Sequence, residues 1–216
     1  MRILGIDQSL NGCGLCVLVD AEVEFMTTID TDDLLGMPRI AKIHAEIIKA
    51  ITPSRPDVIV MEDYAYGANT NNITKLAELG GVIKFGAHIA GFQQTRDALV
   101  RGDNAFHVQT QGSMKKFCLG DGSTKKDTHY LLEVFDRMKK RFEDDNQADA
   151  YMHAWMTFIT VGVLQGRVQI SDLPDHQQLA LMSTGIKRTK KLSEKKALSL
   201  PESEKQRLVA FTYPVI

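Results

Sequence analysis

The spacing of apolar and polar positions changes several times along the chain, and each spacing predicts an element. Three apolar runs near the N-terminus have the length and the β-branched content of strands. They cover residues 2–7, 13–19 and 22–29. Asp20 and Ala21 separate the second run from the third, and we interpret them as a turn. This part of the chain therefore predicts an antiparallel meander.

Helical spacing follows and alternates with two more strands. Pro38 begins a stripe of isoleucines that share one helix face, and Pro53 ends it. The remaining pattern predicts strands over 57–62 and 105–110, and helices over 71–92, over 128–138 and from about 146. This order predicts an α/β fold whose mixed sheet is antiparallel on one side, parallel elsewhere and covered by helices on both faces.

Four glycines interrupt the predicted helix over 71–92, at positions 80, 81, 86 and 91. Glycine weakens a helix by about 1 kcal/mol relative to alanine. We therefore expect close backbone packing there, against the sheet or against a second subunit.

Composition narrows the class of protein. The 216 residues are 44% apolar and 25% charged, with a net charge of −1, so any affinity for nucleic acid must come from local clusters of Lys and Arg. No apolar run is long enough to span a membrane, and Asp7 comes too early for a secretory signal. Three cysteines make no disulfide framework, so we expect a cytoplasmic protein.

Cys13 and Cys16 form a C-x-x-C pair, which can mark a zinc or redox site. No second pair of ligands follows at a suitable spacing. We interpret the two cysteines as small residues packed within a strand.

The composition changes beyond Ser183, where the chain is rich in lysine. We expect one α/β domain over residues 1–182 and a basic C-terminal extension over 183–216 that is extended or mobile. A run of charges usually forms a solvated segment, but this one could also follow DNA phosphates, and we favour DNA contact.

Carboxylates end two predicted strands, at Asp7 and Glu62, and an acidic cluster that includes Asp149 opens the last helix. Each lies among apolar residues, where an ionised carboxylate is costly unless something compensates it. Such groups can hold hard cations like Mg²⁺, and two ions can support phosphodiester cleavage. Alternatively, Asp7 caps a turn and Glu62 merely ends a strand, and the spacing alone leaves both interpretations open.

Four segments, in order, resemble the motifs of RuvC-type Holliday-junction resolvases, which have an RNase H-like fold. ILGIDQSLNGCG is similar to the family's first strand, and EDYAYGANTNNITKLAELGGV to its second motif. MKKFCLGDGSTKKD resembles the K-x-x-x-x-G-x-G-x-x-x-K segment, and NQADAYMHAW the last motif. The resemblance covers about residues 1–165.

The resemblance implies the roles of individual residues. Asp7, Glu62 and Asp149 would be ligands of two Mg²⁺ ions, for which Mn²⁺ would substitute. Asn146 stands where many members have Asp or His, and the preceding Asp145 is an alternative fourth ligand, although on a helix it would point about 100° away.

Further residues would act on DNA. Lys126 resembles the catalytic lysine, and Lys115 a phosphate contact. Tyr64 and Tyr66 flank the position of the family's stacking aromatic residue, so each either stacks on an unpaired base or buries its ring. Lys75, from the K-L pair of the second motif, completes the predicted DNA-binding set.

The expected function is a magnesium-dependent endonuclease for branched DNA, acting as a homodimer without a membrane or a small organic cofactor. Two alternatives remain: an RNase H-like nuclease of other specificity, and a junction-binding protein without activity. An ATPase of the actin type also begins with G-I-D, but 216 residues cannot hold its duplicated domain.

Overall fold

A five-stranded mixed sheet lies at the centre of the computed structural model, which describes residues 1–31, 33–63, 70–189 and 192–210. Its strand order is β3-β2-β1-β4-β5, from β1 (Arg2–Asp7), β2 (Gly12–Val19), β3 (Glu22–Asp30), β4 (Val58–Glu62) and β5 (Ala105–Gln109). The first three strands pair antiparallel, whereas β4 pairs parallel with both β1 and β5. The predicted mixed sheet is confirmed, and no strand bound differs from its prediction by more than one residue.

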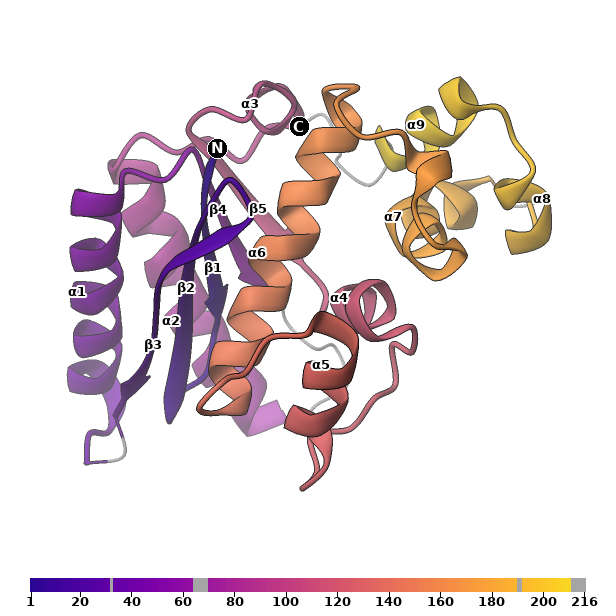
Figure 1. Ribbon diagram of the computed structural model, residues 1–216. Helices are drawn as coiled ribbons and strands as arrows, with labels where there is room; N and C mark the ends of the chain where they lie inside the picture. Colours follow the sequence, from indigo (N-terminus) through magenta and orange to yellow (C-terminus); the bar gives the residue numbers. More distant parts are fainter. Residues whose placement is uncertain (32, 64–69, 190–191, 211–216) are drawn as a thin grey trace.

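Helices cover both faces of this sheet (Figure 1). α1 (Gly36–Ser54) and α2 (Thr70–Ile89) lie over one face, and α6 (Asp145–Leu164) lies over the other. Because strand side chains alternate between faces, β1 contributes to both cores. Leu4 and Ile6 pack with residues of α1 and α2, and Ile3 packs with residues of α6.

α6 lies close against β1 and β2 because two glycines face it. A Cβ at Gly5 would collide with the carbonyl oxygen of Ala150, and one at Gly14 with the carbonyl oxygen of Asn146. Glycine is the residue that allows a strand to approach a helix backbone so closely. This contact holds the first turns of α6 beside the C-terminal end of β1, where Asp7 lies.

Cys13 and Cys16 are both buried in β2, but they belong to the cores on opposite faces of the sheet. Residues an odd number of positions apart on a strand point in opposite directions. Burial raises the pKa of each thiol to about 12. The two cysteines therefore do not act as one ligand pair.

The glycines predicted within α2 pack differently from one another, and Gly91 lies beyond the end of this helix at Ile89. Gly86 lies against the side chain of His44 in α1, whereas no other described element lies near the Cβ positions of Gly81 and Gly91. Close packing is thus explained for Gly86, and the contact with a second subunit stays a prediction. Among the described helices, none is long and apolar enough to cross a membrane.

The C-terminal part is helical, so the expectation of an extended or mobile appendage is wrong for its described residues. A short 3-10 turn, η1 (Ile170–Asp172), precedes α7 (Asp175–Arg188), α8 (Glu194–Leu198) and α9 (Glu202–Ala210), and α7 packs against α9 and against α4 (Gln111–Leu119). Ala197, Leu208 and Val209 are buried there, because apolar residues are dispersed among the lysines. The predicted boundary after residue 182 falls inside α7.

Candidate active site

Asp7 and Glu62 lie next to each other because they end neighbouring parallel strands. The register pairs Ile6 of β1 with Met61 of β4, so the next residue of each strand reaches the same edge of the sheet. The two carboxyl groups interact through a side-chain hydrogen bond, and Asp7 is 2% exposed. The Nε2 of Gln8 supports this edge by donating to the backbone oxygen of Glu62 at 3.1 Å.

Asp149 reaches the same place from α6 and is fully buried. Lys126 joins it to Asp7. The Nζ of Lys126 lies 2.7 Å from Asp149 Oδ2 and 3.5 Å from Asp7 Oδ2. The structure therefore brings together Asp7, Glu62, Asp149 and Lys126, although their roles stay predictions.

The electrostatics of this group favour an additional cation. Burial raises the pKa of Asp7 well above its ordinary value; nearby Lys126 opposes that rise, and Asp149 and Glu62 reinforce it. Burial also raises the pKa of Glu62. Burial lowers the pKa of Lys126, but the surrounding carboxylates raise it more strongly. Ionising these buried carboxyl groups together is therefore costly with one ammonium nearby, and a further cation would lower that cost.

Asp145, rather than Asn146, contacts this group. Asp145 Oδ2 lies 3.2 Å from the Nζ of Lys126. The side chain of Asn146 instead lies against Gly12 of β2. The neighbouring hollow is polar, and its lining includes Asn11, Thr28 and Asp144. Of the two alternatives for a fourth ligand, the contacts favour Asp145.

Two further side chains hold Asp149, and the sequence pattern marked neither of them. The hydroxyl of Tyr130, from α5 (Tyr130–Met138), donates to Asp149 Oδ1. The Nε2 of Gln111, at the start of α4, donates to Asp149 Oδ2 at 3.1 Å. Their positions depend on how α4 and α5 pack beside α6, which no local pattern in the sequence indicates.

Lys115, the predicted phosphate contact, lies inside the protein in this structure, and its contact with DNA stays a prediction. It lies on α4, is 4% exposed, and donates from Nζ to the backbone oxygen of Thr124 at 2.6 Å. The same Nζ lies 5.0 Å from the centre of the Tyr130 ring. In this arrangement Lys115 supports the loop that carries Lys126 and does not face an open surface.

The structure says less about the three other residues that we predicted to bind DNA. Lys75 is exposed on α2, where a DNA backbone could reach it. Tyr64 and Tyr66 lie outside the described residues, so their predicted stacking is not tested.

The donor set fits a hard divalent cation in its chemistry. Carboxylate oxygens are the ligands that such ions prefer, and Asp7 Oδ2 is a buried oxygen without a hydrogen-bond partner. The Nζ of Lys126 lies 3.5 Å from this oxygen, beyond an ordinary ion-pair hydrogen bond. Among the described residues, no three Asp, Glu, His or Cys side chains have the arrangement of a formed metal site.

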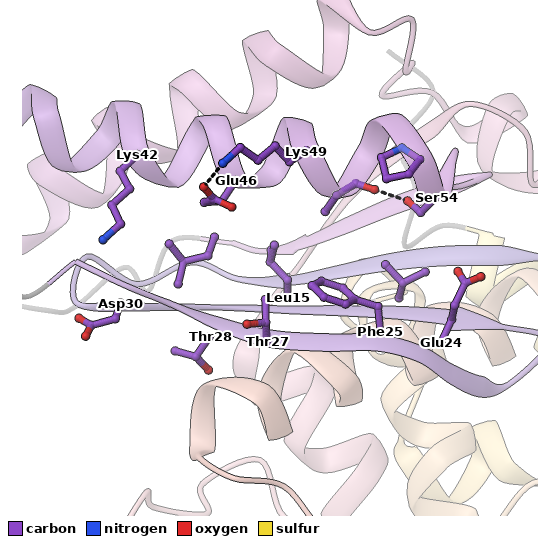
Figure 2. Close-up of a pocket in the computed structure, with 14 residues that line it drawn as sticks. Leu15, Glu24, Phe25, Thr27, Thr28, Asp30, Lys42, Glu46, Lys49 and Ser54 are labelled. Atoms are coloured by element: carbon purple, nitrogen blue, oxygen red, sulfur yellow. Dashed lines mark hydrogen bonds and ion pairs between the residues drawn. The ribbon is translucent and has the colours of Figure 1, made fainter.

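A second hollow lies apart from these carboxylates, between α1 and strands β2 and β3 (Figure 2). Leu15 and Phe25 contribute apolar surface, and Lys49 pairs with Glu46 at 2.5 Å on its rim. Lys42 and Asp30 also line it. This groove brings together no set of buried acids, so the carboxylate group is the candidate active site.

Comparisons with known proteins agree with the motifs. A scan against models of known protein families gives no match. The chain is 27% identical to the RuvC crossover junction endodeoxyribonuclease of Mycolicibacterium vanbaalenii over 156 residues, which are 69% of this chain and 73% of that protein. The resemblance to the RuvC family is confirmed by this similarity.

Solved structures show the same fold. The RuvC structure of Thermus thermophilus matches with a TM-score of 0.56 and 19% identity, and the match covers 77% of this chain and 96% of that one. A structure of the same RuvC in complex with a Holliday junction substrate matches with a TM-score of 0.56 and 19% identity, over 71% of this chain and 90% of that one. The predicted RNase H-like α/β fold is thereby confirmed.

Proposed function

We propose that the chain is an endodeoxyribonuclease that cleaves four-way (Holliday) junctions and depends on divalent metal ions. The observation that carries this proposal is the meeting of Asp7, Glu62, Asp149 and Lys126 at one edge of a RuvC-like fold. The similarity in sequence to a crossover junction endodeoxyribonuclease supports the same activity.

Asp7, Glu62 and Asp149 would hold the metal, with Asp145 or Asn146 as a further oxygen donor. Two Mg²⁺ ions are proposed, and Mn²⁺ would substitute for them. When bound, such ions supply Lewis acidity for the hydrolysis of a phosphodiester. The raised pKa of Asp7 and of Glu62 supports this assignment, because a bound cation would favour the ionised form of these buried carboxyl groups.

Lys126 would have two successive roles. In the metal-free protein its ammonium pairs with three carboxylates and reduces their repulsion. Once these oxygens bind metal, the ammonium becomes available for the scissile phosphate, where it would stabilise the charge that develops during cleavage. The side chain of Lys126, on the loop between α4 and α5, is 30% exposed, so its ammonium can turn toward a bound phosphate without movement of the loop.

A homodimer would place two active sites on one junction. Symmetric cleavage needs two strands to be cut, and a two-fold assembly supplies one site for each. α2 exposes Phe85 and Ile89, which are 66% and 70% exposed, and this apolar surface supports an interface on that helix. Tyr64, Tyr66 and Lys75 would contact DNA near the junction centre.

A junction-binding protein without nuclease activity is the second candidate. One observation favours it: Lys126 already occupies a position between carboxylates that a metal ion would need. Metal titration separates the two candidates, because an active enzyme must exchange the ammonium for metal.

The test is cleavage of a synthetic four-way junction, compared with a linear duplex and a flap, in Mg²⁺ or Mn²⁺. We expect symmetric cuts in the junction and little cutting of the duplex. Binding without cutting by the wild type would support the inactive binder. Equal cutting of all three DNAs would indicate an RNase H-like nuclease of other specificity.

A further inference from the structure

A line of contacts connects α4, the loop before α5, α5 itself and α6 beneath the carboxylates. Lys115 of α4 bonds to the backbone of Thr124, two residues before Lys126. Its ammonium lies over the ring of Tyr130, and the hydroxyl of Tyr130 donates to Asp149. The contacts therefore reach from the lysine loop to a predicted metal ligand.

We propose that Tyr130 and Lys115 form a positioning pair, in which Tyr130 fixes the carboxylate of Asp149 for metal binding and Lys115 fixes Tyr130 and the Lys126 loop. This inference rests on the proposed function and extends it, since it replaces a phosphate contact at Lys115 with an internal role. Neither residue touches the reacting atoms.

The geometry at Asp149 supports the role of Tyr130. The two oxygens of this carboxylate have different partners: Oδ1 accepts from Tyr130, whereas Oδ2 accepts from Gln111 and pairs with Lys126. Holding Oδ1 fixes the rotation of the carboxylate and so keeps Oδ2 beside the ammonium of Lys126, which Asp7 Oδ2 also approaches. Hydrogen bonds to a ligating side chain commonly change metal affinity by about ten- to a hundredfold.

The surroundings of Lys115 support its part of the pair. A buried ammonium must have compensating partners, and Lys115 has a backbone oxygen, an aromatic face and the electrostatic interaction that lowers the pKa of Glu62. A lysine that contacts DNA phosphate needs a solvent-facing ammonium, but Lys115 is 4% exposed.

The first test uses Tyr130→Phe, which removes the hydroxyl and keeps the ring. Tyr151→Phe is the matched control, because Tyr151 is a buried tyrosine that packs between Phe142 and Trp155, away from the carboxylates. Mn²⁺ binding without DNA is measured by calorimetry, together with thermal melting of each variant. We expect Tyr130→Phe to bind Mn²⁺ about ten- to a hundredfold more weakly than the control.

Equal Mn²⁺ affinity for the two variants overturns the proposal for Tyr130. If Tyr130→Phe does not fold, Gln111→Leu tests the same idea through Oδ2, and an unchanged Mn²⁺ affinity in that variant also overturns it. A wild type that binds Mn²⁺ but cuts no DNA contradicts the proposed nuclease, while a loss of Mn²⁺ affinity in Tyr130→Phe would still support the positioning role.

The second test uses Lys115→Met, which keeps the aliphatic stem. Single-turnover cleavage of bound junction should fall at least tenfold, while the dependence of junction affinity on salt stays as in the wild type. A phosphate contact would behave differently, since its loss reduces the salt slope by about 1. A reduced slope with unchanged single-turnover cleavage overturns the role proposed for Lys115.

Discussion

Replacing Lys126 with alanine removes an ammonium that three carboxylates share. Its Nζ lies 2.7 Å from Asp149, 3.2 Å from Asp145 and 3.5 Å from Asp7. Asp149 and Asp7 are almost fully buried, whereas the Lys126 side chain is 30% exposed. Without the ammonium, the negative charges remain and lose their nearest compensation.

The cost follows from the burial of these partners. Removing one member of a buried ion pair typically destabilises a protein by about 3–5 kcal/mol. Water reaches the partly exposed Lys126, so we expect the lower end, about 3 kcal/mol. For a protein of this size each kcal/mol lowers the melting temperature by about 2–4 °C, which gives about 6–12 °C.

The assay is thermal and urea unfolding in EDTA, with Lys125→Ala as the control, because Lys125 is exposed and adjacent in sequence. Mg²⁺ should restore part of the lost stability in Lys126→Ala, since a bound cation replaces the missing charge. In single-turnover assays on bound junction, Lys126→Ala should cut at least about a hundredfold more slowly, with junction affinity nearly unchanged.

Two results would refute this reasoning. Equal melting temperatures for Lys126→Ala and Lys125→Ala in EDTA would show that the ion pairs contribute little to stability. Weaker junction binding with unchanged single-turnover cleavage would make Lys126 a phosphate anchor.

Three further predictions concern titration, assembly and DNA contact. Because the pKa of Asp7 is raised, the folded metal-free protein holds a proton more tightly than the unfolded chain. Its urea midpoint should therefore rise as the pH falls from the raised pKa toward the ordinary 3.8, and Asp7→Asn should reduce this dependence. An identical pH profile for the two proteins would contradict the prediction. Phe85→Glu with Ile89→Glu should convert a dimer to a monomer in sedimentation, and a wild type that is monomeric both free and on DNA would refute the interface. Lys187→Ala with Arg188→Ala, at the exposed end of α7, should weaken junction binding and reduce the salt slope by about 2, and an unchanged slope would argue for a solvated segment.

The strands were predictable because each has a clear apolar pattern bounded by turn residues. Leu4 and Ile6 alternate with Ile3, which is the pattern of a strand buried on both faces. Asp20 and Ala21 both adopt positive φ, at 47° and 76°, as a tight hairpin turn requires. Asp7 and Glu62 were visible as candidates because each ends such a strand.

The last two helices, α8 and α9, were missed because each is short and has few apolar residues, with charged residues before them. Leu208 and Val209 show a helical face only once α7 provides the surface that they cover. In addition, Gly185 allows α7 to approach the backbone of Leu208 closely, a contact that no local pattern indicates.

Residues that support the candidate site depend on tertiary packing. Tyr130 and Gln111 come from different helices and meet only at Asp149. Lys115 carries the family motif, but its burial is set by the loop that folds over α4. The sequence identified the charged groups, whereas their partners required the structure.

The most direct test of the proposed function compares wild type and Asp7→Asn on one labelled four-way junction in Mg²⁺. The wild type should cut two opposite strands symmetrically, and Asp7→Asn should leave the junction intact while binding it with nearly wild-type affinity, because phosphate contacts supply most of that affinity. A junction that the wild type binds and leaves uncut in both Mg²⁺ and Mn²⁺, or equal cutting by the two proteins, would contradict the assignment of these carboxylates to a nuclease.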